Sequence, residues 1–193
     1  MIYFTADTHF GHSSIIKYCN RPFNNIDEHD EGLIHNWNSV VKKGDTIYHL
    51  GDFGHTKDIN RMKRISNRLS GQINLIKGNH DTNLEYIANR FNFIKDTHLI
   101  TTKVFDNKVR IFLSHYAHRT WVHRPRDCFH LFGHAHGNMG SYGLSFDVGV
   151  DCWGYRPISI EEVYHHVHTN LMPSWEAEKS LIRENNKVEE YKL

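Results

Sequence analysis

The segment INLIKGNHD, residues 73–81, shows the pattern that decides the fold. Its first five residues have the length and the apolar, β-branched content of a buried strand, and they lead directly into Gly78-Asn79-His80-Asp81. Asparagine, histidine and aspartate can all bind metal ions, and a neighbouring glycine lets backbone pass close to a ligand. The segment therefore predicts a strand that delivers polar side chains to one end of a sheet.

Four other apolar runs end in the same way. Their polar followers are Asp7 and His9 after residues 2–6, Gly51-Asp52 after 46–50, Ser114-His115 after 109–113, and Gly133-His134-Ala135-His136 after 129–132. Because ligands of α/β sheets bind beyond the carboxyl ends of the strands, the five segments are expected to converge on one crevice. In each D-x-H or H-x-H pair, the two side chains point the same way from an extended backbone, so both can reach one ion or two adjacent ions.

The rest of the chain alternates strand-like and helix-like segments, which predicts an α/β or α+β domain. Further strands are expected at residues 99–104 and 144–150, the first forming an antiparallel hairpin with residues 109–113. Helices are expected over residues 26–43 and 59–69, after Thr82, and after Ser159, where Glu162 completes a capping box. The first three strands are separated by helices and are therefore expected to be parallel.

The length of 193 residues indicates one domain, which we place at residues 1–170. Residues 171–193 are rich in charge and predict an amphipathic helical tail. The tail is interpreted either as a helix packed on the domain or as a tail for interaction with another molecule, and packing is the preferred interpretation. The apolar residues that would make the packed face are Trp175, Leu181, Ile182 and Val188.

The composition excludes several classes of protein. Lys and Arg total 23 against 22 for Asp and Glu, a net charge of +1 that argues against bulk binding of nucleic acid. No apolar run approaches the roughly 20 residues of a membrane span, and the N-terminus lacks the basic region of a secretory signal. Three cysteines without a C-x-x-C pair suit a reducing compartment, so we expect a cytoplasmic protein. The unusual feature of the composition is its 17 histidines, a residue that commonly binds metal ions.

The five strand-end motifs resemble those of the calcineurin-like metallophosphoesterase superfamily, and the resemblance covers residues 1 to about 165. The segments Arg21-Pro22-Phe23 and Trp37-Asn38 add a similarity to small single-domain members from bacteria and phages. The resemblance implies a four-layer α/β/β/α sandwich, in which two mixed β-sheets are flanked by helices.

Carried over residue by residue, the resemblance implies a site for two divalent metal ions. Asp7, His9 and His136 would hold the first ion, Asn79, His115 and His134 the second, and Asp52 would bridge both. An anionic carboxylate between two cations screens their repulsion at the about 3.5–4 Å separation of two-metal sites. Imidazole, carboxylate and amide ligands suit Mn, with Fe, Zn, Ni or Co as further options.

The implied activity is metal-dependent hydrolysis of a small phosphate ester, preferably a nucleotide-like phosphodiester. In this role His80 would protonate the leaving oxygen, while Asp81 would either orient His80 or cap the following helix, and capping is the preferred interpretation. Two alternatives remain open, a phosphomonoesterase and a metal-binding scaffold without catalysis. The sequence leaves the oligomeric state open.

Substrate-binding residues are harder to identify from the sequence. His12 and Arg21 follow motif residues closely and are expected at the rim of the site. Arg119 and Trp121 belong to a basic stretch after His115 that either lines the site, gripping phosphate and stacking a base, or forms a solvated loop with one buried tryptophan. Both interpretations of this stretch stay open.

Overall fold

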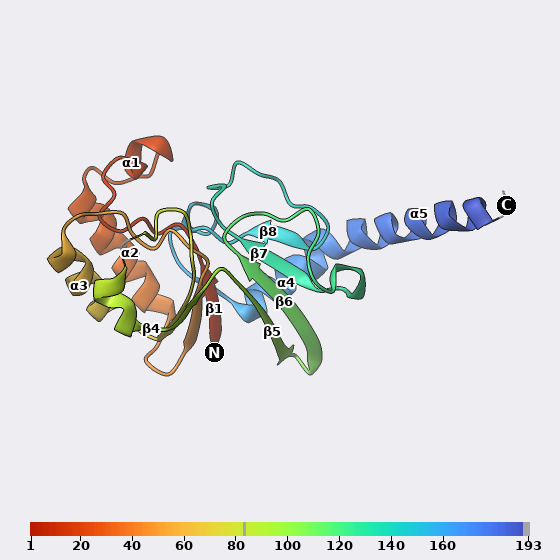
Figure 1. Cartoon of the computed structure of the whole chain (residues 1–193), viewed down its shortest axis with the longest axis horizontal. Helices are drawn as coiled ribbons and strands as arrows, with labels where there is room; N and C mark the ends of the chain where they lie inside the picture. The colour runs from red at the N-terminus through yellow and green to blue at the C-terminus, as the bar shows by residue number, and fades with distance from the viewer. Residues whose placement is uncertain (83, 191–193) are drawn as a thin grey trace.

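The strands lie in two mixed sheets, which confirms the predicted fold class (Figure 1). The computed structural model describes residues 1–82 and 84–190, with side chains through residue 181. The first sheet has the order β4-β3-β2-β1-β9, and in it β1 to β4 are parallel while β9 runs antiparallel to β1. Its strands are β1 (Ile2–Thr5), β2 (Thr46–His49), β3 (Gln72–Ile76), β4 (Phe91–Lys95) and β9 (Ile158–Ser159).

The second sheet has the order β5-β6-β7-β8. Its strands are β5 (Thr97–Val104), β6 (Asn107–Ser114), β7 (Phe129–Phe132) and β8 (Ser145–Asp147). The expected hairpin is confirmed, since β5 and β6 pair antiparallel from Thr97↔Ser114 to Val104↔Asn107. Strands β6, β7 and β8 are parallel, so their carboxyl ends meet at one edge.

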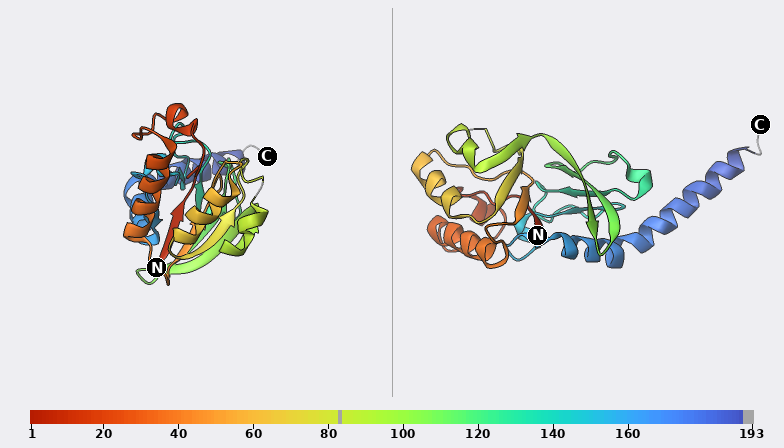
Figure 2. Two further views of the ribbon diagram at one scale, coloured as in Figure 1. Left: turned by 90° about the vertical axis from the view of Figure 1, so that its left-hand side faces the viewer. Right: turned by 90° about the horizontal axis from the view of Figure 1, so that it is seen from below.

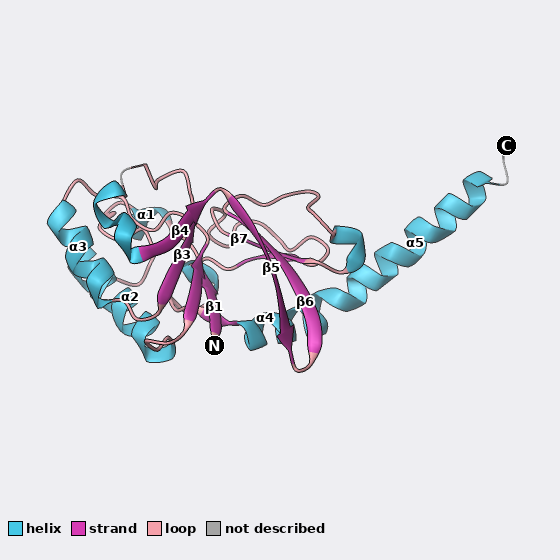
Figure 3. Cartoon of the chain, turned by 60° about the horizontal axis from the view of Figure 1, so that its bottom comes forward, coloured by secondary structure: helices cyan, strands magenta, loops and turns pink. Residues whose placement is uncertain are grey.

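Helices flank the two sheets, as the secondary-structure colouring makes clear (Figure 3). The α-helices are α1 (Ile15–Tyr18), α2 (Ile26–Val40), α3 (Ile59–Arg68), α4 (Ile160–His166) and α5 (Met172–Glu190). Short helical turns are η1 (Glu85–Arg90), η2 (Arg124–Arg126), η3 (Val150–Cys152) and η4 (Val167–Leu171). The capping box at α4 is confirmed, because Glu162 N–H donates to Ser159 Oγ and Ser159 N–H donates to Glu162 Oε2.

Side-chain alternation along the first sheet separates two apolar cores. On β2, the buried Ile47 belongs to the core with α2 and α3, which includes Leu33 and Trp37. The next residue, Tyr48, packs on the opposite core, which joins the two sheets and α4. Each fully buried Leu, Ile or Phe contributes about 1.5–3 kcal/mol, so both faces of this sheet hold its strands and their ends in place.

Two strands, β4 and β9, are not predicted by the sequence pattern. The expected helix after Thr82 is only the short turn η1, and the next residue, Phe91, begins β4. Strand β4 forms by pairing with β3, and β9 has two residues that pair with β1. Both owe their conformation to a partner strand distant in the sequence, which local periodicity does not report.

The tail forms the helix α5, which extends away from the two sheets (Figure 2). Its start packs on the domain, since Trp175 is 2% exposed and its indole N–H donates to Asp127 Oδ1 at 2.7 Å. The expected packing of Leu181 is wrong, because this side chain is 61% exposed, and the side chains of Ile182 and Val188 lie outside the described ones. Among the helices of the described residues, none has the length and apolar character needed to span a membrane.

His130 is fully buried in the second sheet between two serine hydroxyl groups. Ser114 Oγ lies 2.7 Å from its Nε2 and donates its own proton to the Tyr116 carbonyl oxygen, so it accepts the Nε2 proton. Ser145 Oγ, 2.8 Å from Nδ1, then donates to that unprotonated nitrogen. Burial, followed by the nearby His118, lowers the pKa of His130 to about 3. The folded protein therefore holds this ring neutral.

Acidification is expected to destabilise the fold through this histidine. An unfolded histidine has a pKa near 6.5, so between about pH 6.5 and 3 the unfolded chain binds one more proton at this position than the folded chain. Each such histidine makes the free energy of unfolding fall by up to about 1.4 kcal/mol per pH unit as the pH is lowered.

Urea unfolding between pH 7 and 4 measures this slope. His130→Gln is expected to give a shallower slope than the unmodified chain, whereas His35→Gln, at an exposed position, keeps the original slope. An unchanged slope for His130→Gln would contradict the assignment.

Candidate metal centre

The structure brings together all seven residues expected to bind metal. In a first group, donor atoms of Asp7, His9 and His136 lie within 4.8 Å of one another. In a second group, donor atoms of Asp52, His115 and His134 lie equally close together. Asp52 Oδ2 connects the two groups, at 3.5 Å from His9 Nε2 and 3.6 Å from His115 Nε2. Asn79 joins the second group, with its Oδ1 3.0 Å from His115 Nε2.

The backbone turns sharply at the strand ends to present these side chains. Positive φ angles, between 48° and 68°, occur at five of the seven residues, namely Asp7, His9, Asp52, His134 and His136. Such conformations cost of order 1–3 kcal/mol each in residues other than glycine, and they persist where the surrounding structure holds them. Five of the eleven non-glycine residues with a positive φ in the described part of the chain lie at this one site, and such grouping is typical of a functional centre.

Two glycines make the close approach of these loops possible. Gly51 has φ +98°, and a Cβ there would overlap His115 Nδ1. A Cβ on Gly78 would overlap the backbone nitrogen and the carboxylate of Asp52. A side chain at either position would push the residues of the second group apart. Steric contact therefore explains why both motifs carry a glycine there.

The first group contains buried polar atoms without a protein partner. Asp7 Oδ2 accepts the His134 N–H at 2.8 Å, while Asp7 Oδ1 and His9 Nε2 have no hydrogen-bond partner among the described residues. Burial, then the charges of Asp147 and Asp52, raises the pKa of Asp7 well above its usual value, and burial lowers the pKa of His9. Both pKa shifts arise because burial removes water from the charged forms of these groups, which costs free energy. A bound cation would offset that cost.

The second group points three acceptor atoms at one another. His115 Nδ1 lies 2.8 Å from the Leu50 carbonyl oxygen and donates its proton to it. Burial lowers the pKa of His115, so the neutral ring turns the lone pair of Nε2 toward the oxygens of Asp52 and Asn79. A cation between these atoms would satisfy all three, and imidazole, carboxylate and amide donors together suit a transition metal.

Asp151 supports the first group and was missed by the sequence analysis. Its Oδ2 accepts a 2.7 Å hydrogen bond from His136 Nδ1, which leaves Nε2 of that ring available for an ion. Asp151 follows the predicted strand at residues 144–150, for which no site residue was proposed. The strand-end rule that identified the other motifs could therefore have found it.

Arg21 is buried and bonded to protein atoms, which corrects its expected place at the substrate rim. The side chain is 4% exposed and pairs with both carboxylate oxygens of Asp151, at 2.9 and 2.8 Å. It also donates to the carbonyl oxygens of Asp7 and Thr8. Arg21 therefore acts as a positioning residue that holds Asp151 and the loop of Asp7 and Thr8.

Asp81 does not cap a helix, contrary to the preferred interpretation of the sequence. The turn η1 begins later and has no side-chain cap. The buried carboxylate of Asp81 instead accepts backbone N–H groups from Asp52, Phe53 and Gly78, at 2.8–2.9 Å. It thereby ties the loop after β2 to the loop after β3, the two loops that carry Asp52 and Asn79.

Asp81→Ala is expected to lower the free energy of unfolding by about 2–4 kcal/mol, since each buried donor left unpaired costs roughly 1–3 kcal/mol. Asp58 is a matched control, because its carboxylate does cap a helix, accepting Arg61 N–H at 2.9 Å. Asp58→Ala should lose only about 1 kcal/mol. Urea unfolding compares the two variants, and equal losses would show that Asp81 does not join the loops.

His80 lies next to the carboxylate of Asp52. Its backbone N–H donates to Asp52 Oδ1 at 2.8 Å, and its side chain lies within 4.8 Å of donor atoms of His9 and Asp52. The ring is partly exposed and contacts His55 edge to face, with ring centres 4.7 Å apart. This placement suits a group that exchanges a proton with a substrate at the centre.

The expected substrate-binding residues fall into different environments. His12 lies at the centre, where its Nδ1 is 3.2 Å from His9 Nδ1, and burial lowers its pKa to about 4. Arg119 is exposed and lines a separate cavity with Met139 and Tyr142. Trp121 is 7% exposed and donates its indole N–H to the Cys128 carbonyl oxygen, so of its two open interpretations the structure favours the buried tryptophan over base stacking.

Comparisons with known proteins agree with the geometry. A family model described as a calcineurin-like phosphoesterase superfamily domain matches residues 1–141. An uncharacterized protein of Methanocaldococcus jannaschii is 33% identical over 174 residues, covering 83% of this chain and 87% of that protein. The Gene 66 protein of Mycobacterium phage L5 is 30% identical over 201 residues, covering 86% and 95%. A solved structure of a protein of unknown function from Aquifex aeolicus superposes with a TM-score of 0.66 at 29% identity, covering 86% and 98%.

Proposed function

The chain belongs to the calcineurin-like phosphoesterase superfamily, and we propose that it is a two-metal phosphodiesterase that acts on small nucleotide-like diesters. Family membership supports metal-dependent hydrolysis of phosphate esters in general. The observation that carries the two-metal proposal is the position of Asp52, whose Oδ2 faces His9 on one side and His115 on the other.

The ligand assignment follows the two groups of side chains. Asp7, His9 and His136 would hold one ion, and Asn79, His115 and His134 the other, with Asp52 shared. When bound, the two ions would lower the pKa of a water molecule and neutralise charge on the phosphoryl oxygens. Manganese is the proposed metal, with Fe, Zn, Ni or Co as alternatives of the same coordination chemistry.

The protein contributes a fixed geometry and one proton. Hydrogen bonds to Asp151 and to the Leu50 carbonyl group hold the rings of His136 and His115 before substrate arrives. His80 is held beside Asp52 through its backbone, which leaves its imidazole free to donate a proton to the leaving oxygen. Such general-acid help is worth typically 10²–10⁴-fold in rate.

The charge around the centre supports a diester. A diester carries one negative charge, whereas a monoester is dianionic near neutral pH and needs more cationic contacts. Arg21, the arginine beside the first group, is neutralised by Asp151. On the open side, Asn79 and His134 are exposed, which leaves room for esterified groups on both sides of the phosphorus.

A substrate panel tests the proposal. In Mn²⁺, the chain is expected to hydrolyse bis-p-nitrophenyl phosphate with a higher kcat/KM than p-nitrophenyl phosphate, and a chelator should abolish both activities. His35→Ala, at an exposed position away from the motifs, serves as the control and should behave as the unmodified chain. A preference for the monoester would make the protein a phosphatase, and bound metal without hydrolysis of either ester would make it a binding scaffold.

A further inference from the structure

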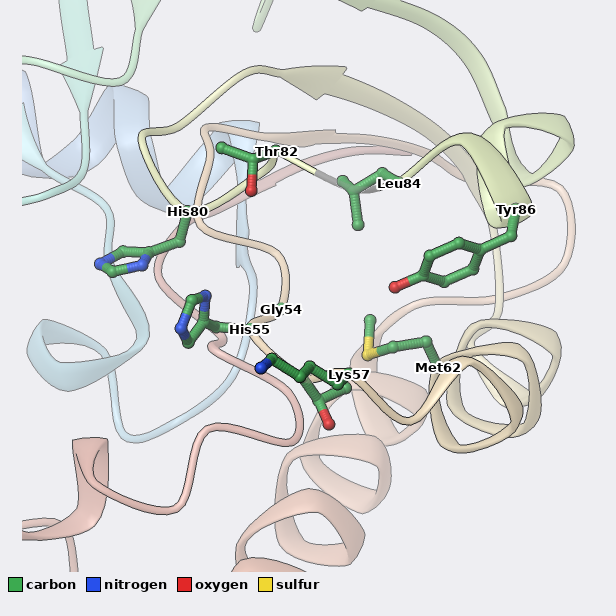
Figure 4. A pocket seen from close by; sticks show the side chains of 9 residues that line it. Gly54, His55, Lys57, Met62, His80, Thr82, Leu84 and Tyr86 are labelled. Atoms are coloured by element: carbon green, nitrogen blue, oxygen red, sulfur yellow. The ribbon is translucent and has the colours of Figure 1, made fainter.

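A cavity of ≈ 250 Å³ lies beside His80 and His55 (Figure 4). Nine described residues line it, and they include His80 but none of the seven proposed metal ligands. They are Gly54, His55, Thr56, Lys57, Met62, His80, Thr82, Leu84 and Tyr86. The cavity therefore adjoins the proposed proton donor without being part of the metal centre.

The walls of the cavity combine apolar surface with polar edges. Met62 and Leu84, 1% and 7% exposed, give an apolar surface, and Tyr86 closes the end opposite His80 and His55, with its hydroxyl group turned into the cavity (Figure 4). Sulfur, aliphatic and aromatic groups of this kind pack well on flat rings. Lys57 is the one formally charged residue among the nine, which makes the cavity unsuited to a cationic ligand.

We propose that this cavity binds the leaving group of the diester, and that the group it fits is a nucleoside. The inference rests on the proposed function. In hydrolysis the oxygen of water bonds to phosphorus, the P–O bond to the nucleoside breaks, and His80 supplies the proton of the released hydroxyl group. Atoms beyond that oxygen must extend past His80, and the cavity is the space that adjoins its ring.

The size of the cavity agrees with this occupant. At ≈ 250 Å³ it is slightly smaller than the roughly 300–1,000 Å³ of typical ligand sites. One ring system fits such a space, whereas a folded peptide or a long chain does not. A base would lie against Met62 and Leu84 and contact Tyr86, while its sugar would remain near His80.

The first test measures binding without turnover, with adenosine as the probe and methyl-labelled methionine as the NMR reporter. The chain has four methionines, of which Met62 lines this cavity and Met139 lines the separate cavity beside Arg119. Adenosine is expected to shift the Met62 methyl signal saturably and to leave Met1, Met139 and Met172 in place. A shift of Met139 alone, or of no methionine, would overturn the proposal.

Variants of Tyr86 sharpen the binding test. Because stacking on an aromatic side chain is worth about 1–3 kcal/mol per base, Tyr86→Ala should weaken adenosine binding about 10-fold or more. Tyr86→Phe keeps the ring and should restore most of the affinity. Phe105→Ala removes an exposed aromatic ring from the turn between β5 and β6 and is the matched control. Equal affinity in Tyr86→Ala and the control would overturn the proposal.

The second test separates this pocket from the proposed function. It compares a dinucleoside monophosphate, which releases a nucleoside, with the methyl ester of the same nucleotide, which releases methanol. Tyr86→Ala should lower kcat/KM for the dinucleoside monophosphate about 10-fold relative to kcat/KM for the methyl ester. Hydrolysis of both diesters with an unchanged kcat/KM ratio would overturn the proposed nucleoside pocket and leave the proposed diesterase activity standing. Adenosine binding at Met62 without hydrolysis of either diester would support the pocket and overturn the diesterase.

Discussion

Asp52→Asn is expected to remove at least one metal ion per chain and to reduce diester hydrolysis by 10²–10³-fold or more, the range seen when one group that stabilises transition-state charge is lost. The carboxylate faces both His9 and His115, and in the proposed centre its charge would let two cations share the space. Asparagine keeps the shape and one oxygen acceptor but carries no charge. The loss should therefore be electrostatic rather than steric.

The measurement pairs metal content with turnover of bis-p-nitrophenyl phosphate. Asp106→Asn, at an exposed turn position, makes the same chemical change away from the site and should retain both metal and rate. Circular dichroism confirms that each variant is folded. Two ions and normal turnover in Asp52→Asn would show that the ligands are assigned wrongly.

His80→Ala is the second large effect, and it should depend on the leaving group. A ribose hydroxyl is a basic leaving group that needs a proton, so its release should slow by about 10²–10⁴-fold. p-Nitrophenolate departs without a proton, and its release should slow much less. The metal content should stay intact, because His80 reaches Asp52 through its backbone N–H, which alanine keeps.

The contrasting variant is His115→Ala, which removes a proposed ligand of the second ion. It should lose metal, and its rates on both kinds of diester should fall together. The informative quantity is the ratio of rates for poor and good leaving groups in saturating Mn²⁺. An unchanged ratio in His80→Ala with full metal content would mean that this histidine positions substrate or stabilises charge instead of donating a proton.

The convergence of the seven proposed metal ligands could be predicted because each follows a strand end. Each lies shortly after an apolar run, and parallel pairing places Asp7 beside Asp52 at the end of one sheet and His115 beside the His134 loop at the end of the other. The packing of the two sheets on each other then brings these two sets together. The loop glycines at 51, 78 and 133 belonged to the same pattern. Short-range sequence therefore contained most of the site.

The errors concern side chains whose roles depend on distant partners. Arg21 follows a motif closely and looked like a rim residue, but its partner Asp151 is 130 positions away. Asp81 looked like a helix cap, but its acceptor atoms face the backbone of residues 52 and 53, on the neighbouring loop. For Trp121 the sequence left stacking and burial open, and the side chain is buried. Only tertiary structure reveals these contacts, because nothing local specifies the partner.

We propose that the activity requires two ions on the Asp52 carboxylate, and a metal titration is the decisive experiment. Metal-free chain receives Mn²⁺ in steps while bound ions and hydrolysis of bis-p-nitrophenyl phosphate are measured on the same samples. We expect full activity to require two bound ions per chain and a chelator to remove it. Full activity in excess chelator, or activity that saturates at one ion, would contradict the proposal.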